Sequence, residues 1–339
     1  MTDTASMHAA KAAKDSSPVG PAPGRLPIDY AARRPTFKTP RALRWPLVIL
    51  AVTLAALFSW TLARMFDRWQ APAGYYSHGP LILPIAIVTA WLIIRARGLP
   101  MHSTPWSRRL ALALLAVAMV GHLASMFARV TFVSGFMLLP VMAACVLYLG
   151  GFPMLSRLWF PIAFLAFMVP LPDLTIYNIN FKLKIVAAQA STAIVNGLGT
   201  PAFLKGSDIF LPSGKHLTVE DACSGLKSLI SLLAFATLFA YACKLRGYKR
   251  LLLFLSAVPI AIAANIVRIS VLTMVAHHYD PALCVPGGWV HDLMGFVVFV
   301  IAFLLMFLLE ELLDLLPGAR SGNWLGSTLV PHLSRAPQA

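Results

Sequence analysis

The sequence has few charged residues for its length. Only 12% of its 339 residues are Asp, Glu, Lys or Arg, whereas 58% are hydrophobic. So few charged residues beside so many hydrophobic ones leave too little polar surface to cover a soluble globular protein of that size. We therefore expect lipid to be the solvent for most of the chain.

Cysteines and cofactor motifs are also scarce. The chain has four cysteines, which are too scattered for a disulfide framework, and no CxxC pair indicates zinc or redox chemistry: Cys145, Cys223, Cys243 and Cys284. No Gly-rich phosphate loop, HExxH or GxSxG segment occurs. We expect neither a cofactor nor a bound metal.

The net charge of +15 does not indicate a nucleic-acid partner. The basic residues form short clusters between apolar runs and not a stripe with interleaved aromatic residues. Membrane topology explains this arrangement better, because positively charged loops stay in the cytoplasm.

Apolar runs of about 20 residues, the length that crosses a bilayer, predict an all-α polytopic fold with about eight transmembrane helices. We place them near residues 45–63, 80–95, 109–127, 131–149, 156–171, 223–243, 250–277 and 290–316. Basic clusters precede the first span, follow the second and separate the sixth from the seventh. They fall on one side of the membrane if the count is right, so we expect both termini inside.

The expected domain organisation follows from these spans. Residues 1–43 are predicted to be a disordered cytoplasmic tail, residues 44–317 the membrane domain, and residues 318–339 a second flexible cytoplasmic tail. The connection at about 172–222 faces outward. Its first half, residues 174–198, is too polar for a confident span, and we interpret it as a helix at the interface.

The second half of this connection has the pattern of a β-hairpin. Two short alternating runs, 207–211 and 216–219, flank the turn-forming residues 212–215. A hairpin there would present a substrate or fix the start of the sixth span.

Cys223 is the first candidate for chemistry, because a polar loop enters the sixth span at this point. A helix N-terminus stabilises a thiolate. Glu220 and Asp221 oppose this effect by repulsion, although Asp221 is also a candidate helix cap. The alternative is a buried cysteine that only packs.

Arg268 and His291 are the other two candidates. An arginine well inside the seventh span costs roughly 2.5–3.5 kcal/mol on insertion, so it normally has a partner or a task, and Asn265 lies one turn earlier on the same face. His291, with Asp292 beside it, opens the eighth span and can exchange a proton with a thiol. The alternatives are a helix-packing ion pair or a snorkelling arginine, and a capping histidine.

These segments resemble the signatures of the exosortase and archaeosortase family of membrane cysteine transpeptidases. The family's Cys-Ser-Gly segment appears as Cys223, Ser224 and Gly225, its Asn-x-x-Arg segment as residues 265–268, and its late His followed by Gly as His291 and Gly295. The resemblance also includes residues 76–81, with His78, which we consider equally as a substrate-lining residue or a structural turn. It covers residues 45–315.

The resemblance implies a reaction and its partners. Cys223 attacks exported proteins at a C-terminal sorting motif such as Pro-Glu-Pro, which precedes a hydrophobic helix and a basic tail, and a thioester is resolved by a surface acceptor or water. Arg268 inherits the oxyanion role and His291 the acid/base role. It also implies a multi-pass protein of a bacterial or archaeal inner membrane, with an external active site, associated with exopolysaccharide systems.

Two rival hypotheses stay open. One is a transporter or polysaccharide-export component in which Arg268 binds an anionic substrate. Inverted repeats in the sequence would favour this hypothesis, and we find no repeat. The other is a structural disulfide between Cys223 and Cys284 in an oxidising compartment.

Overall fold

The computed structural model describes residues 41–71, 74–212, 214–219, 224–279, 281–284 and 288–316. Of the candidate site residues, Glu220, Asp221 and Cys223 lie outside the described residues, as does the tail predicted at 318–339. The predicted N-terminal tail of residues 1–43 lies outside them too, except that the first helix already includes residues 41–43.

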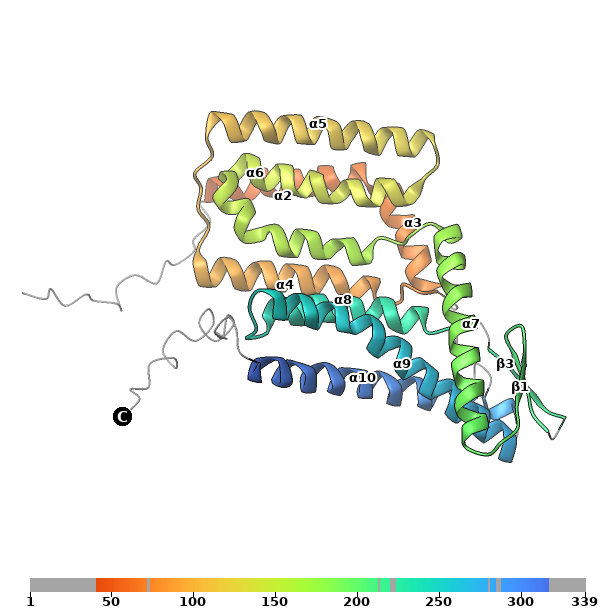
Figure 1. Cartoon of the computed structure of the whole chain (residues 1–339). Coiled ribbons are helices and arrows are strands. Elements are labelled where there is room, and N and C mark those ends of the chain that lie inside the picture. Colours follow the sequence, from red (N-terminus) through yellow and green to blue (C-terminus); the bar gives the residue numbers. More distant parts are fainter. Residues whose placement is uncertain are drawn as a thin grey trace, which may run out of the picture. The chain divides into compact units, whose positions relative to one another are not determined.

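Helices make up most of the first part of the chain (Figure 1). Helix α2 passes into α3 through a bend of 69°. In chain order the elements are α2 Arg41–Leu57, α3 Ser59–Gln70, α4 Gly79–Arg97, α5 Pro105–Phe127, α6 Thr131–Phe164 and the 3-10 helix η1 Leu165–Met168.

Helix α6 reverses direction at Gly151, and Figure 1 shows its second half running back beside its first. Gly151 has φ +69° and ψ −168°, which no helix contains. A β-carbon there would lie 2.5 Å from the carbonyl oxygen of His102. Glycine is required here for both its backbone freedom and its missing side chain. The apolar runs predicted at 131–149 and 156–171 correspond to the two arms.

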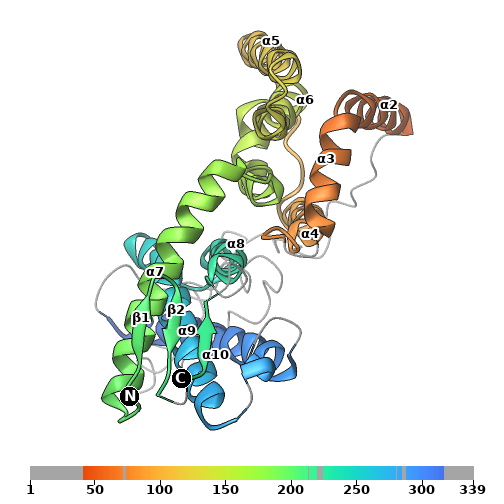
Figure 2. The same ribbon diagram turned by 90° about the vertical axis from the view of Figure 1, so that its right-hand side faces the viewer.

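The connection that we expect to face outward contains one long helix, α7 Asp173–Gly197. Both views show it crossing the ends of the other long helices (Figures 1 and 2). Its buried face includes Ile176, Asn180, Ala187, Ser191 and Val195, which recur at a helical period. The helix expected at 174–198 is thus present.

A three-stranded antiparallel sheet follows α7. Strands β1 Phe203–Lys205, β2 Asp208–Phe210 and β3 His216–Thr218 lie in the order β1-β2-β3. The β2–β3 pair, with Ile209 opposite Leu217, is the expected hairpin. Strand β1 was not predicted. The sheet lies beside α7 and α9 (Figure 2). Its buried residues Ile209, Leu211 and Leu217 belong to two hydrophobic clusters that include residues of these helices.

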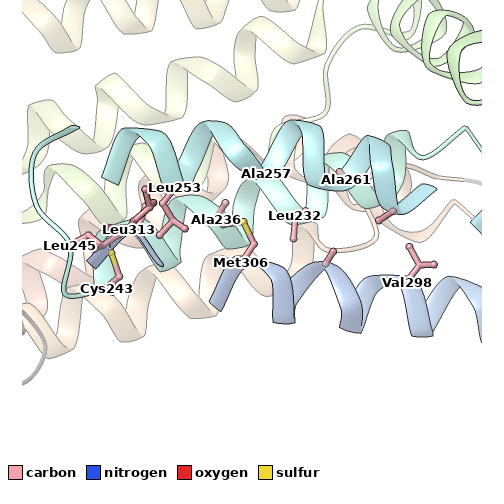
Figure 3. Close-up of a cluster of buried hydrophobic side chains, with 13 residues drawn as sticks. Leu232, Ala236, Cys243, Leu245, Leu253, Ala257, Ala261, Val298, Met306 and Leu313 are labelled. Carbon is pink, nitrogen blue, oxygen red and sulfur yellow. Dashed lines mark hydrogen bonds between the residues drawn. The ribbon is translucent and has the colours of Figure 1, made fainter. Parts of the chain in front are cut away.

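The last three long helices, α8 Leu226–Ala242, α9 Tyr248–His278 and α10 Trp289–Leu315, pack around one core, with the 3-10 helix η3 Pro281–Cys284 between α9 and α10. Figure 3 shows small residues at the contacts. Alanines at positions 236, 257, 261 and 302 are all buried. Small side chains let helix backbones approach closely, which is how helices associate in lipid.

The number of spans differs from the sequence expectation of eight. Five described helices are long and apolar enough to cross a membrane, or six if the bent α2–α3 pair forms one span. Helix α6 with η1 counts once although it reverses, and α8, with 17 residues, is apolar but shorter than these helices. The structure thus supports an all-α, multi-pass membrane protein, and eight spans stays a prediction.

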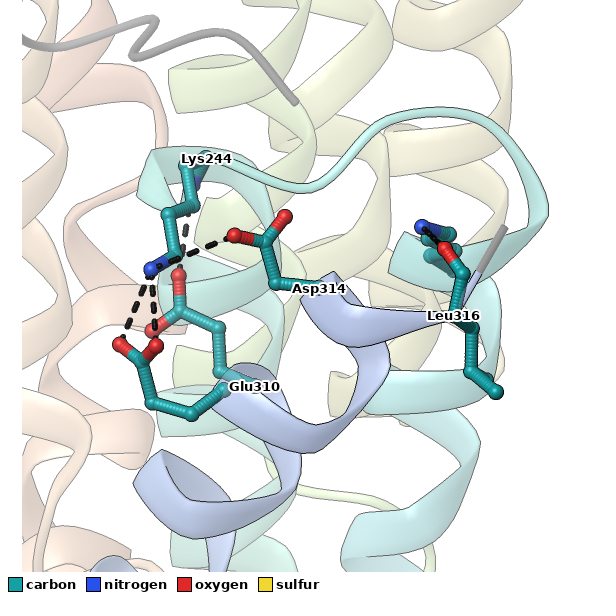
Figure 4. A network of polar contacts seen from close by, with 6 residues as sticks. Lys244, Glu310, Asp314 and Leu316 are labelled. Carbon is teal, nitrogen blue, oxygen red and sulfur yellow. Dashed lines mark hydrogen bonds and ion pairs between the residues drawn. The ribbon is translucent and has the colours of Figure 1, made fainter. Parts of the chain in front are cut away.

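Two loops that carry basic clusters are each held by contacts with a neighbouring helix. Arg157 Nη1 donates to the carbonyl of Gly98 at 2.8 Å. Lys244 binds Glu311 at 3.0 Å and Asp314 at 3.5 Å (Figure 4). Figure 1 places these loops at the end opposite α7 and the strands. The two described loops whose charges are predicted to share one side of the membrane therefore share one end of the structure.

Candidate active site

Helix α9 carries two of the predicted site residues on one face. Asn265 leaves 3% of its surface exposed, and Arg268, one turn later, is half-buried. The segment before α9's midpoint is bound to α8 and α10 by its buried alanines, so both side chains have a fixed position relative to those helices.

The guanidinium of Arg268 contacts the first turn of α10. Its Nη2 lies 3.0 Å from His291 Nε2 and donates to the His291 carbonyl at 3.2 Å. Gly295, one turn along α10, leaves room for this group, because a β-carbon there would lie 3.2 Å from Nη2. Two of the three side chains expected to converge are therefore in contact.

The contact determines the tautomer of His291. An arginine can only donate hydrogen bonds, so Nε2 must be the accepting nitrogen. The ring proton then resides on Nδ1, which donates to Asp292 Oδ1 at 3.1 Å. The His291 side chain is 7% exposed, whereas the Asp292 side chain is 68% exposed. A buried ring is thus held between a cation and a solvated carboxylate.

Ser224 and Gly225 lie against the same face of α9. Both are buried, and a β-carbon on Gly225 would lie 2.7 Å from Asn265 Cγ. Gly225 has φ +83° and is the N-cap residue of α8; Asp221, the cap candidate, lies outside the described residues. Ser224 Oγ accepts from the Leu226 amide at 3.2 Å. Glycine is required at position 225 both for the positive φ and for the missing side chain.

The sheet brings the chain to this point. Ile209 and Val219 are buried with Ile269 of α9, and Leu211 and Leu217 are buried with Leu272 of α9 and Val290 of α10. The described chain therefore arrives at Val219 and resumes at Ser224 against the helix pair that carries Arg268 and His291. The nucleophile candidate, Cys223, belongs to the segment in between, outside the described residues.

His78 contacts α8. Its Nδ1 is 3.3 Å from Ser231 Oγ on α8, and its ring is 5.9 Å from that of Tyr76. Burial lowers the pKa of His78, a hydrogen bond with the Phe167 backbone opposes this, and the charge of Lys227 lowers the pKa further. These contacts fit the structural turn that we considered beside the substrate-lining role.

Sequence reasoning missed the contribution of α7. Leu183 and Ala187 line a cavity of about 10 Å³ beside Ser224, Gly225 and Asn265, which is room for one water at most. Ser191 Oγ also donates to the Ile266 carbonyl at 3.0 Å. Leu183, Ala187 and Ser191 are spaced four residues apart, and this helical period was the signal in the sequence for a buried face of α7.

Comparison with known proteins decides the family. The family model for transmembrane exosortases matches residues 69–308 of this chain. The chain belongs to the transmembrane exosortase family. The match begins in α3 and ends in α10, so it includes all the candidate site residues. No match was found among curated proteins or solved structures.

Membership in this family agrees with the resemblance found in the sequence. It supports, in general terms, a multi-pass membrane transpeptidase that processes proteins with C-terminal sorting signals. The apolar helices of this exosortase fit that description.

Proposed function

We propose that this exosortase cleaves C-terminal sorting signals with Cys223 as the nucleophile, Arg268 as the oxyanion donor and His291 as the acid/base. The observation that carries the proposal is the contact between Arg268 Nη2 and His291 Nε2 at 3.0 Å, next to the helix start that follows Cys223. A cation and an imidazole in contact are two of the three parts that acyl transfer needs.

In this mechanism the thiol of Cys223 gives its proton to His291, and its sulfur attacks the carbonyl carbon of the scissile peptide bond. Arg268 stabilises the oxyanion, where one donor contributes roughly 2.7–4 kcal/mol. The carbon–nitrogen bond breaks as His291 returns the proton to the leaving amine, and a thioester forms. Water or the nucleophile of a surface acceptor then releases the product.

The remaining candidates have supporting roles in the proposal. Asn265 supports the backbone at Ser224 and Gly225, since it packs directly on Gly225. Asp292 orients His291 through Nδ1. Glu220 and Asp221 are proposed to border the substrate, and His78 to brace α8 rather than touch the substrate.

We also propose that the site faces the outside of a bacterial or archaeal inner membrane. The basic loops share the end of the bundle opposite α7 and the strands, and positively charged loops stay inside. Arg268 lies toward the other end, with His291 in the first turn of α10. The substrates would be exported proteins ending in a motif, a hydrophobic helix and a basic tail.

The transporter hypothesis is not favoured by family membership. Arg268 also has a contact inside the protein, and the described cavity nearby holds about 10 Å³, which is too small for a transported anion. The disulfide hypothesis depends on Cys223, so labelling tests it directly: a thiol-specific reagent must modify Cys223 in intact cells if the nucleophile is free.

The deciding experiment compares two cysteine variants in cells that make an exported reporter with a sorting signal. Cys223→Ala is expected to abolish processing, whereas Cys145→Ala, which changes a cysteine inside α6, is the control and retains it. A covalent reporter adduct that neutral hydroxylamine releases should form with the unmodified protein and not with Cys223→Ala. Normal processing by an inserted Cys223→Ala protein would end the proposal.

A further inference from the structure

A second site lies near the outer ends of α3, α5 and α6, away from the Arg268–His291 contact. It is a cavity of about 1000 Å³, which is within the size range of small-molecule sites. Its lining combines three arginines and two aspartates with apolar and aromatic residues. The charged members are Arg64, Asp67, Arg68, Arg129 and Asp173.

One positive charge is left in excess in this cavity. Arg68 is neutralised by a two-pronged ion pair with Asp173, in which Nη2 donates to Oδ2 at 2.8 Å. Among the described residues, neither Arg64 nor Arg129 has a carboxylate partner; the guanidinium of Arg64 lies 4.7 Å from the centre of the Trp60 ring. Both arginines can therefore donate to a bound anion.

The backbone adds to this preference for an anion. Thr131 and Phe132, the first two residues of α6, line the cavity, and a helix N-terminus is an anion-binding element. Arg129 has φ +57° and is the one described non-glycine residue with positive φ. A side chain there costs about 1–2 kcal/mol relative to glycine, so the arginine is placed at a position that disfavours it.

The surroundings indicate that the anion comes from the membrane. Phe127, next to the cavity-lining Met126, is 90% exposed, and Trp60 is 55% exposed. In a membrane protein, apolar rings exposed this far at the ends of spans face the lipid headgroup region. A lipid phosphate that enters here brings its acyl chains alongside these rings, which a soluble anion does not.

We propose that this cavity binds the phosphate headgroup of an anionic membrane lipid, held by Arg64, Arg129 and the N-terminus of α6. One negative charge matches the excess of one positive charge in the lining. The proposal does not rest on the catalytic assignments, because none of the catalytic candidates lines the cavity.

The test is native mass spectrometry of the purified full chain titrated with phosphatidylglycerol or phosphatidylcholine. Arg64→Gln and Arg129→Gly should each weaken phosphatidylglycerol binding about tenfold, as expected for one lost charge-assisted hydrogen bond. Arg109→Gln, an exposed arginine in the first turns of α5, is the matched control and should bind as the unmodified chain does. Cys223→Ala should also bind normally, which separates this proposal from the catalytic one.

Arg129→Gly carries a second readout. Glycine relieves the positive φ, so the variant should keep or gain thermal stability while it loses lipid, which excludes misfolding as the cause. Three results would overturn the proposal: equal binding of phosphatidylcholine, equal binding of inorganic phosphate alone, or unchanged lipid binding in both variants.

Discussion

Gly295→Ala is the sharpest test of the proposed site, because it shifts Arg268 without removing a candidate catalytic group. The new β-carbon would lie 3.2 Å from Arg268 Nη2, inside the 3.5–4.0 Å at which non-bonded atoms are most stable. The guanidinium must move by a few tenths of an ångström. The 3.0 Å contact with His291 Nε2 then lengthens toward the limit of a hydrogen bond.

The size of the effect follows from what is displaced. Loss of an oxyanion donor costs roughly 10²–10³ in rate, and here the donor is shifted and not removed. We therefore expect processing to fall about 10- to 100-fold. Alanine gains roughly 0.5–1 kcal/mol over glycine inside a helix, which offsets part of the weakened hydrogen bond, so the melting temperature should change little.

The assay is the initial rate of reporter cleavage at matched membrane levels of the enzyme. Gly197→Ala is the matched control: it is a helical glycine of α7, and a β-carbon there would meet nothing within 4 Å. It should cleave at the normal rate. Equal rates for both variants would refute the role of Arg268 in stabilising the transition state.

Two further predictions concern stability. Gly151→Ala should destabilise the fold by about 2–4 kcal/mol, of which about 1–2 kcal/mol comes from the positive φ and the rest from the clash with the His102 carbonyl. The control is Gly98→Ala, which is also at φ +69° but in open space and so shows the backbone cost alone in a melting assay. Equal losses of stability in the two variants would contradict the clash. Burial lowers the pKa of His78 in the folded protein. As the pH falls below about 6.5, the ordinary pKa of a histidine, His78 therefore takes up a proton in the unfolded chain before it does so in the folded protein. The stability of the fold should then decrease as the pH falls from about 6.5 to the folded-state pKa. His78→Gln should flatten the melting temperature between about pH 5 and pH 7, and an unchanged slope would show that another group causes it.

Much of the helical content follows from the composition. Each of the eight predicted apolar runs overlaps a helix of the structure, because long apolar stretches in lipid must satisfy their backbone groups internally. The span count could not be read in the same way. The 69° bend between α2 and α3 and the reversal at Gly151 depend on single residues within otherwise continuous helical sequence.

The strand missed by the sequence shows a second limit. Strand β1 is only Phe203–Lys205, and it joins β2 through the two residues 206 and 207. Three residues are too few to show an alternating pattern. What makes them a strand is the partner edge of β2 and the packing of Leu204 beside Ile209 and Ile269, which only tertiary structure reveals.

The candidate site residues could be chosen from the sequence, but their contacts could not. Arg268 stood out because a charge within an apolar span is costly, and His291 because it opens the next helix. The sequence could not show that one donates to the other. Nor could it show that Gly225 and Gly295 each lie against a polar side chain of α9, Asn265 and Arg268.

The contact between Arg268 and His291 also constrains how the proposed reaction would begin. His291 Nε2 uses its lone pair to accept from the guanidinium, and the same lone pair would have to take the proton of Cys223. Both cannot occur at once, since the nitrogen has one lone pair. The substrate carbonyl is the natural competitor for the guanidinium, because its oxygen becomes the oxyanion. Binding of the scissile bond would then draw Arg268 away and free His291 as the base, so that the thiol is activated only when a substrate is in place.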